Sequence, residues 1–187
     1  PPAHVMVVSQ GGIAFRRTWE PDPEPGIRYR RDEDYADHCR AVFEEAVRCR
    51  LRSVTPPAVL MSGGLDSAPV AAVAARELAR QGHRLTTVSY VFDELPSCDE
   101  RRYMDPMVRR FGLDARRFAG DDAWPFSNLA TWPFDASSPM EGLYRELRNR
   151  SYTTAREAGA AVLLTGEHGD ALYCGGEQWL ADLLWEG

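Results

Sequence analysis

VLMSGGLDSAPVAA (residues 59–72) joins a short apolar run to an alanine-rich segment through six residues, Ser62 to Ser67. An apolar run followed by glycines and then by helix-forming residues predicts a buried strand, a tight turn and a helix. Small residues after a strand let backbone N–H groups converge on an anion, and the positive end of the following helix adds to the attraction. The segment therefore predicts an anion site, with Ser67 as the residue that caps the helix.

The alternation of strand and helix continues along the chain. Apolar runs occur at residues 58–61, 85–92, 116–118 and 160–165, and helical patterns lie between them at 68–80, 103–111 and 143–158. Strands separated by helices predict an α/β fold, a doubly wound parallel sheet with helices on both faces. Such sheets bind ligands beyond the carboxyl ends of their strands. The loops 62–67 and 166–170 both follow predicted strands.

A different pattern precedes this region. Residues 4–19 hold two short apolar runs around a pair of glycines, which predicts a short β-hairpin. Three prolines within residues 21–25 predict an extended connector. From residue 34 to about 51, apolar residues recur at spacings of three and four, which predicts an amphipathic helix. We therefore divide the chain into a hairpin and linker, residues 1–33, and an α/β region, residues 34–187.

Composition limits the classes of function. A chain of 187 residues with 44% hydrophobic and 27% charged residues is typical of one globular domain. Its formal charge of −6 argues against nucleic acid or a membrane surface as the main partner. No apolar run approaches the roughly 18 residues of a membrane-spanning helix. The four cysteines form no CxxC pair and follow no apolar leader, so the cytoplasm is the expected location.

The basic residues limit the kinds of phosphate-binding loop that the chain can contain, because all 22 are arginine. A Walker loop needs lysine in GxxxxGK[ST], and the stretch also lacks the GxGxxG of a dinucleotide site. It resembles instead the pyrophosphate loop of the ATP pyrophosphatase superfamily. The resemblance implies that Asp66 binds Mg²⁺, an ion that prefers oxygen ligands. It also implies that four loop residues hold the β and γ phosphates of ATP: Ser62, Gly63, Gly64 and Ser67.

A second motif, LLTGEHGDALYCGG (residues 163–176), follows the last predicted strand and carries two carboxylates. It resembles the TGEGGDELFGG motif of asparagine synthetases and departs from it at His168, Ala171, Tyr173 and Cys174. The resemblance implies that Asp170 is a second magnesium ligand. It further implies that Glu167 is an acid/base residue facing the acyl carbon, with Gly166 as a candidate beside it.

Other stretches resemble the same family more loosely. TTVSYVFDE (residues 86–94) resembles its second strand, which implies that the backbone of Val88, Ser89 and Tyr90 faces adenine. CDERRY (residues 98–103) resembles the acidic start of the next helix. Glu100 is therefore a candidate site residue, with an ordinary carboxylate at a helix start as the alternative.

The resemblance also bears on domain organisation. Residues 1–33 resemble the last hairpin and linker of a glutamine amidotransferase domain. Residues 34–187 resemble the amino-terminal part of a synthetase domain, which in this family continues and supplies a lysine near the transferred phosphate. Because this sequence has no lysine, we expect a partner chain or further segments to complete the domain.

Three further features have simpler interpretations beside a functional one. His168 is interpreted as an exposed loop histidine, because histidine prefers softer metals than Mg²⁺. Trp124 and Trp132 lie in a long segment that is either a substrate lid or a cover for the sheet, and both interpretations stay open. Two pairs of arginines are interpreted as solvated: Arg109, Arg110, Arg116 and Arg117.

The resemblance implies ATP-dependent amide-bond formation of the asparagine synthase type, with the formation of asparagine as the default reaction. A small-molecule or peptide carboxylate is activated as an acyl-adenylate with release of pyrophosphate, and an amine or ammonia then releases AMP. ATP and Mg²⁺ are the expected cofactors. Two alternatives remain open. One is an intramolecular amide synthetase, like the β-lactam or peptide macrolactam cyclases of the family. The other is a non-catalytic nucleotide-binding half-domain that needs a partner.

Overall fold

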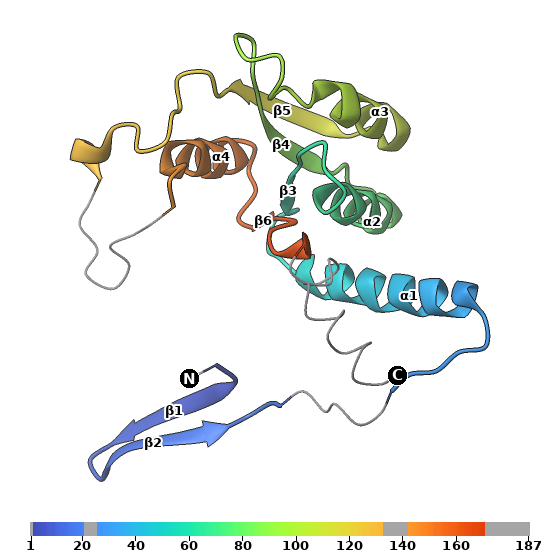
Figure 1. Cartoon of the computed structure of the whole chain (residues 1–187), viewed down its shortest axis with the longest axis vertical. Coiled ribbons are helices and arrows are strands. Elements are labelled where there is room, and N and C mark those ends of the chain that lie inside the picture. The colour runs from blue at the N-terminus through green and yellow to red at the C-terminus, as the bar shows by residue number, and fades with distance from the viewer. Residues whose placement is uncertain (1, 21–25, 133–141, 171–187) are drawn as a thin grey trace, which may run out of the picture. The chain divides into compact units, whose positions relative to one another are not determined.

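The computed structural model describes residues 2–20, 26–132 and 142–170 (Figure 1). The chain separates into two compact units, Pro1–Arg40 and Ala41–Gly187. The boundary between them falls inside helix α1 (Asp32–Arg50). The presence of α1 confirms the helix expected from residue 34 onward. The resemblance of residues 1–33 to an amidotransferase hairpin stays a prediction.

The first unit contains the predicted β-hairpin. Strands β1 (His4–Ser9) and β2 (Gly12–Arg17) pair in antiparallel register, with His4 opposite Arg17. Gly12 has a φ of +117°, a conformation that the tight turn requires and that glycine adopts readily. The apolar side chains of this hairpin, among them Val8 and Phe15, are largely exposed.

The second unit is built on a parallel sheet of four strands. They are β3 (Ala58–Leu60), β4 (Thr86–Val91), β5 (Asp114–Ala119) and β6 (Leu163–Leu164), in the order β5-β4-β3-β6. All three strand pairs are parallel, and β4 and β5 pair over six residues. The predicted fold class is confirmed.

Helices cover both faces of this sheet (Figure 1). Helices α2 (Ser67–Arg80) and α3 (Arg101–Phe111) lie on one face, and α4 (Arg145–Glu157) lies on the other. Alternation along β3 explains the two layers. Val59 packs into the cluster under α2 and α3, whereas Ala58 packs with α4. Full burial of a side chain such as Val59 stabilises the fold by roughly 1.5–3 kcal/mol.

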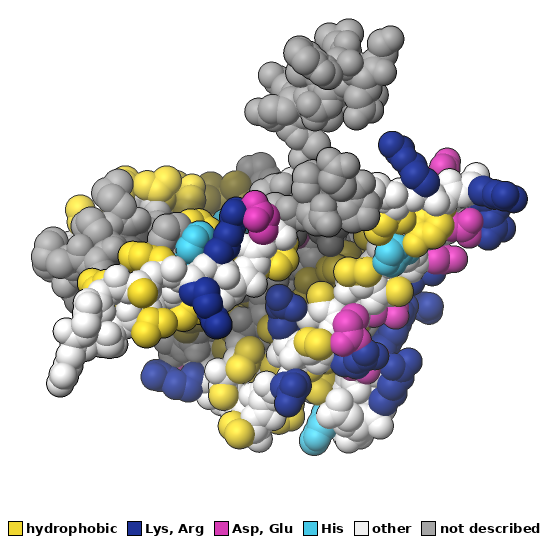
Figure 2. Space-filling model, turned by 90° about the horizontal axis from the view of Figure 1, so that it is seen from below, with side chains coloured by type: hydrophobic (Ala, Val, Ile, Leu, Met, Phe, Trp, Pro, Cys, Tyr) yellow, Lys and Arg dark blue, Asp and Glu magenta, His cyan; other side chains and the backbone are white. Residues whose placement is uncertain are grey.

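The alanine-rich sequence of α2 lets this helix approach the sheet closely. Its buried residues are small or branched: Val70, Ala71, Val73, Ala74, Ala75 and Leu78. Charged side chains stay on the outside, and Figure 2 shows arginines scattered over one face of the molecule, several beside acidic side chains. Two such surface pairs are Arg40 with Asp37 and Arg80 with Glu77. Within the described residues, no helix combines the length and apolar character needed to cross a membrane.

The strand order reverses at β3, and this reversal positions the site. From β3 the chain moves outward through β4 to β5, and then returns to place β6 on the opposite side of β3. Loops that leave neighbouring strands in opposite directions open a crevice at the carboxyl ends of those strands. The loops 62–67 and 166–170 begin at this point, directly after β3 and β6.

Candidate functional site

The loop 62–67 is closed on itself by its two serines. The Ser67 hydroxyl lies 2.8 Å from the Ser62 hydroxyl, accepts a hydrogen bond from the Ser62 N–H at 3.0 Å and reaches the Ser62 carbonyl at 3.2 Å. The prediction that Ser67 caps α2 is therefore wrong. Ser67 is the first residue of the helix, and its hydroxyl reaches back across the loop rather than forward along the helix.

The N-cap residue of α2 is Asp66, and its side chain makes no capping hydrogen bond. The backbone of Gly169 packs against this carboxylate instead. A Cβ atom placed on Gly169 would lie 2.4 Å from Asp66 Cγ and 2.5 Å from its Oδ1. Only a glycine therefore permits the second loop to approach Asp66 this closely.

Gly166 makes a similar contact with the start of α2. A Cβ atom on Gly166 would lie 2.6 Å from the backbone nitrogen of Ser67 and 2.7 Å from the carbonyl carbon of Asp66. These neighbours are backbone atoms, which cannot rotate away as a side chain can. The two predicted loops are therefore in direct contact, backbone against backbone.

We expect Gly166→Ala to force the two loops apart. Overpacking of this kind costs about 1–3 kcal/mol, and it should appear as a lower urea midpoint together with weaker nucleotide binding. Gly11→Ala is the control, because a Cβ there meets only the Ser9 hydroxyl at 3.6 Å, an ordinary contact. A Gly166→Ala protein with the parent midpoint and the parent affinity for ATP would contradict the contact.

The two loops together line a cavity of about 450 Å³. Eight residues proposed from the sequence contribute to its wall: Ser62, Gly64, Asp66, Ser67, Tyr90, Gly166, Glu167 and Asp170. Asp66 and Asp170 supply carboxylate oxygens, which suit Mg²⁺. Among the residues that the structure describes, no group of three or more His, Cys, Asp or Glu side chains is placed to hold a metal. A magnesium ion here would rely on the two carboxylates and on phosphate oxygens.

Gly63 does not line this cavity. Its N–H donates a hydrogen bond to Glu100 Oε2 at 2.9 Å, and a Cβ on Gly63 would lie 2.7 Å from the Cβ of Tyr103. Glu100 makes no side-chain capping bond at the start of α3. This carboxylate therefore fastens the first loop to the next helix, which differs from the ordinary role of an acid at a helix start.

The stretch expected near adenine is mostly interior. Val88 is fully buried, and its carbonyl accepts a hydrogen bond from the Met61 N–H at 2.9 Å. The Ser89 hydroxyl donates to the Met61 carbonyl at 2.6 Å. Only the third residue, Tyr90, lines the cavity. The contact of this stretch with adenine stays a prediction, with Tyr90 as the residue best placed for it.

The Tyr90 hydroxyl remains neutral near physiological pH. Burial, and after it the negative charges of Glu100 and Glu167, raises the pKa of this phenol. A neutral phenol both donates and accepts hydrogen bonds. Tyr90 therefore presents a hydrogen-bond donor to the cavity that it lines with Glu167.

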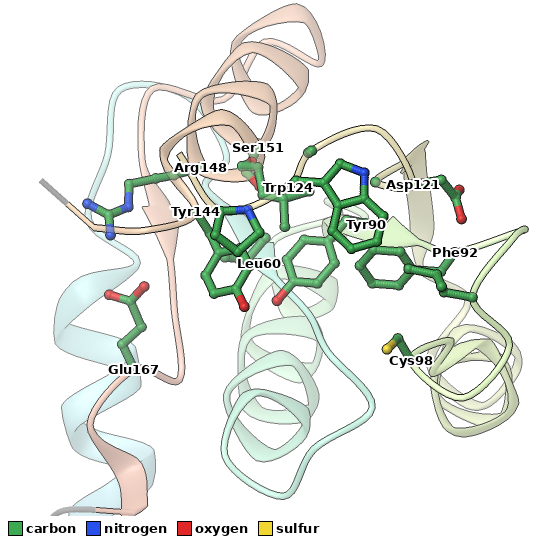
Figure 3. A pocket seen from close by; sticks show the side chains of 15 residues that line it. Leu60, Tyr90, Phe92, Cys98, Asp121, Trp124, Tyr144, Arg148, Ser151 and Glu167 are labelled. Atoms are coloured by element: carbon green, nitrogen blue, oxygen red, sulfur yellow. The ribbon is translucent and has the colours of Figure 1, made fainter. Parts of the chain in front are cut away.

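Glu167 belongs to two cavities at once. It lines the space beside the loop 62–67, and it also lines a second space of about 590 Å³ that extends toward α4 (Figure 3). Leu60 and Tyr90 are shared between the two spaces as well. The exposed carboxylate of Glu167 is thus accessible to a ligand in either cavity.

His168 is exposed, as expected, and its backbone is left-handed, with a φ of +68°. This conformation costs an L-residue roughly 1–2 kcal/mol. It gives a physical reason for the glycine that the resembling motif carries at this position.

We expect His168→Gly to relieve this strain. Glycine also raises the conformational entropy of the unfolded chain, which offsets part of the stabilisation. The free energy of unfolding should therefore rise by up to about 1 kcal/mol. The matched control is His83→Gly, because His83 is exposed and is absent from the described residues with positive φ. Urea denaturation measures both variants, and equal destabilisation by the two substitutions would contradict the strain at His168.

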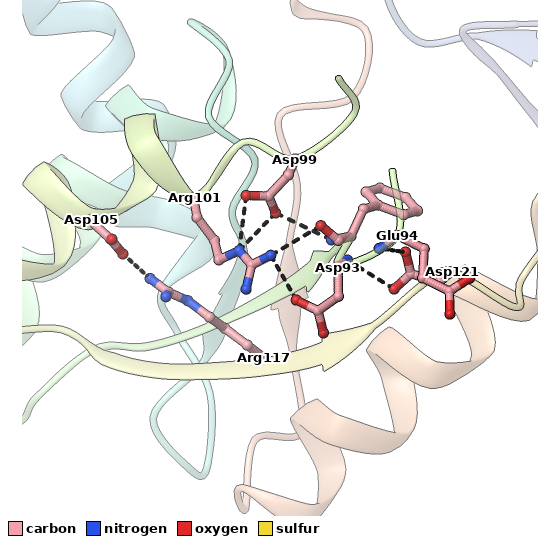
Figure 4. A network of polar contacts seen from close by, with 8 residues as sticks. Asp93, Glu94, Asp99, Arg101, Asp105, Arg117 and Asp121 are labelled. Carbon is pink, nitrogen blue, oxygen red and sulfur yellow. Dashed lines mark hydrogen bonds and ion pairs between the residues drawn. The ribbon is translucent and has the colours of Figure 1, made fainter. Parts of the chain in front are cut away.

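Sequence reasoning missed the polar network that holds the segment after β4 (Figure 4). Arg101 donates to both carboxylate oxygens of Asp99 at 2.9 Å, to Asp93 and to the Phe92 carbonyl. Its hydrogen bond lowers the pKa of the Asp99 carboxyl. Asp121 accepts from the N–H groups of Asp93 and Glu94 at 3.0 and 2.7 Å. The network fixes one end of the second cavity.

The arginines interpreted as solvated are exposed in the structure. Arg109 and Arg110 lie on the outside of α3. Arg116 pairs with Asp114, and Arg117 pairs with Asp105. Of the two tryptophans, Trp124 lines the second cavity, whereas Trp132 donates to the Ser127 carbonyl. The end of the second motif, Ala171 to Gly176, lies outside the described residues.

Comparison with known proteins gives a consistent result. A family model described as asparagine synthase matches residues 38–187. The amidase chyE of Penicillium rubens is 29% identical over 168 residues, 84% of this chain and 25% of that protein. A glutamine-hydrolyzing asparagine synthetase of Zea mays is 26% identical over 193 residues, 94% of this chain and 30% of that protein. Asparagine synthetase 3 of Bacillus subtilis, also glutamine-hydrolyzing, is 32% identical over 94 residues, which cover 50% of this chain and 15% of that protein. The chain thus spans less than a third of each relative.

Proposed function

The chain belongs to the asparagine synthase family, and we propose that it is part of a ligase that uses ATP to join a carboxylate to an amine or ammonia. The observation that carries this proposal is the contact between the two loops. Gly166 and Gly169 pack against Asp66 and Ser67, which brings Glu167 and Asp170 to the loop 62–67. A nucleotide loop and an acid/base candidate therefore share one cavity.

The first step is the activation of the carboxylate. A substrate carboxylate oxygen attacks the α phosphorus of ATP, and the bond to the pyrophosphate group breaks. Ser62, Gly64 and Ser67 border the space in which the pyrophosphate would lie, at the positive end of α2. In the structure the Ser62 and Gly64 N–H groups donate to the hydroxyls of Ser67 and Ser62. We propose that phosphate oxygens replace these hydroxyls as acceptors when the nucleotide binds.

Magnesium fits the residues of this cavity. Asp66 and Asp170 would hold the ion, because both carboxylates line the same space and Asp66 is free of any capping bond to α2. The glycine at position 169 leaves Asp66 the room that a Cβ would fill. The ion supplies positive charge that stabilises the departing pyrophosphate.

The second step forms the amide. The amine nitrogen attacks the acyl carbon of the adenylate, the bond from that carbon to the AMP oxygen breaks, and the nitrogen loses a proton. Glu167 is the proposed acceptor of this proton, since it lines both cavities. Tyr90, which lines both cavities together with Glu167, is proposed to orient the groups through its neutral hydroxyl.

Titration calorimetry tests this function on the intact protein. ATP should bind in the presence of Mg²⁺ and lose most of its affinity when the metal is chelated. AMP should bind more weakly than ATP and should show little dependence on Mg²⁺, because it lacks the pyrophosphate group. Equal affinities for ATP and AMP, each independent of Mg²⁺, would contradict the assignment of the loop 62–67.

A further inference from the structure

The second cavity carries information about the substrate. Its volume is about 590 Å³, and it opens from Glu167 along the inner side of α4. Most of its lining residues are apolar or aromatic, among them Phe92, Leu95, Trp124, Pro125, Tyr144 and Leu147. Figure 3 shows Arg148 and Glu167 at one end of this space, and Phe92, Cys98 and Asp121 at the other.

The walls of this cavity are held by specific contacts. Arg150 on α4 bonds both carboxylate oxygens of Asp122 at 2.6 and 2.8 Å, which ties the segment before Trp124 to the helix. Gly120 lets Leu147 and Phe92 come together, because a Cβ there would lie 2.9 and 3.0 Å from their side-chain atoms. The cavity is therefore a formed part of the domain rather than a gap between loose segments.

The charges in the wall are confined to its ends. Asp121 at the far end is already engaged by two backbone N–H groups. Among the described lining residues, Arg148 is the only cation, and it lies at the Glu167 end. Between the ends the described wall carries no charged side chain, and its polar side-chain groups include the hydroxyls of Tyr90, Tyr144 and Ser151. It therefore offers no opposite charge to a second charged group in a ligand.

The volume of the cavity also favours a ligand larger than aspartate. A water-sized group occupies roughly 30 Å³, and by that measure an aspartate fills less than half of the cavity. An aspartate also carries an ammonium group and two carboxylates, and the middle of the described wall provides no opposite charge for a second charged group. A ligand with an aromatic or bulky apolar body would bury its surface against Trp124 and Tyr144.

We propose that the acyl substrate carries an aromatic or bulky apolar group, which this cavity receives while the carboxylate lies beside Glu167 and Arg148. The inference rests on the proposed function, because it takes Glu167 as the point where the acyl carbon sits. It narrows the substrate to a class different from aspartate. The cavity then acts as the pocket that selects the carboxylate.

Stable acyl-adenylate analogues test this proposal by calorimetry on the full-length protein. The probes are 5′-O-sulfamoyladenosine and its N-(3-phenylpropanoyl) and N-(β-aspartyl) derivatives. Burial of a phenyl group predicts that the phenylpropanoyl derivative binds about tenfold or more tightly than the aspartyl derivative. Equal or tighter binding of the aspartyl derivative would overturn the substrate class and leave the ligase function standing. Failure of all three probes to bind would overturn the ligase function itself.

A matched pair of tyrosines separates the acyl group from the adenosine as occupant of the cavity. Tyr144 lines the cavity and is 53% exposed, whereas Tyr152 lies outside it on the same helix and is 55% exposed. Tyr144→Ala should reduce the preference for the phenylpropanoyl derivative over sulfamoyladenosine about fivefold, and Tyr152→Ala should not change it. If Tyr144→Ala weakens both probes equally, the cavity holds adenosine and the proposal is wrong.

Discussion

Asp66→Ala is expected to abolish magnesium-dependent binding of ATP. Asp66 lines the cavity beside the loop 62–67, and its side chain makes no capping bond to α2 that would need replacing. We therefore expect its carboxylate to contribute to the ligand site rather than to the helix. Loss of an outer partner of a metal site typically costs about 10–100-fold in affinity, and loss of a direct ligand should cost more. Titration calorimetry with ATP and Mg²⁺ measures the effect.

The control for this experiment is Asp37→Ala. Asp37 is an exposed carboxylate that pairs with Arg40 on the surface of α1, so its loss should leave ATP affinity unchanged. The urea midpoint of Asp66→Ala should stay close to that of the parent. An Asp66→Ala protein that binds ATP with parent affinity in Mg²⁺ would remove the basis for placing the pyrophosphate at this loop.

Glu167→Gln is expected to separate the two chemical steps. Glutamine keeps the size and hydrogen bonding of the side chain but cannot accept the proton that the attacking amine must lose. A positioned carboxylate contributes typically about 10²–10⁴-fold to such a transfer. Amide formation should therefore fall by that factor, while pyrophosphate release continues and acyl-adenylate accumulates. Rapid quench with labelled ATP follows the adenylate and the amide separately.

Glu157→Gln is the matched control, because Glu157 is an exposed carboxylate at the end of α4. It should leave both steps at the parent rate. Asp66→Ala should lose both steps, since it prevents nucleotide binding. Amide formation at the parent rate in Glu167→Gln would mean that this carboxylate only shapes the glycine-rich turn.

The fold was largely predictable because its elements carry clear patterns. The runs at β3 and β4 are apolar and lie between helices, as buried parallel strands require. β5 was expected over 116–118 but extends over Asp114–Ala119. Charged residues at this edge of the sheet interrupt the apolar pattern, while pairing with β4 still continues over six residues. β6 was expected within 160–165 but covers only Leu163–Leu164, where it pairs with β3 over two residues.

The two loops of the site were predictable from the sequence, whereas the contacts between distant segments were not. Both loops follow predicted strands of a parallel sheet. The sequence therefore predicts that Asp66 and Glu167 lie at the same edge of that sheet, where its strands end. The bond between Glu100 and the Gly63 N–H joins residues 37 positions apart, and no local pattern encodes it. The same holds for the second cavity, whose walls come from β4, the segment after β5 and α4. Such contacts depend on packing between elements, which periodicity does not describe.

Transfer of oxygen from the carboxylate to AMP tests the central claim most directly. The full-length protein is incubated with ATP, Mg²⁺, hydroxylamine as the amine, and 3-phenylpropionate labelled with ¹⁸O in its carboxylate, with labelled aspartate in a parallel reaction. If the carboxylate attacks the α phosphorus, one labelled oxygen leaves with AMP when the amide forms, and mass spectrometry of the nucleotide detects it. Our account predicts labelled AMP and unlabelled pyrophosphate. The formation of ADP with labelled inorganic phosphate from either carboxylate would contradict it.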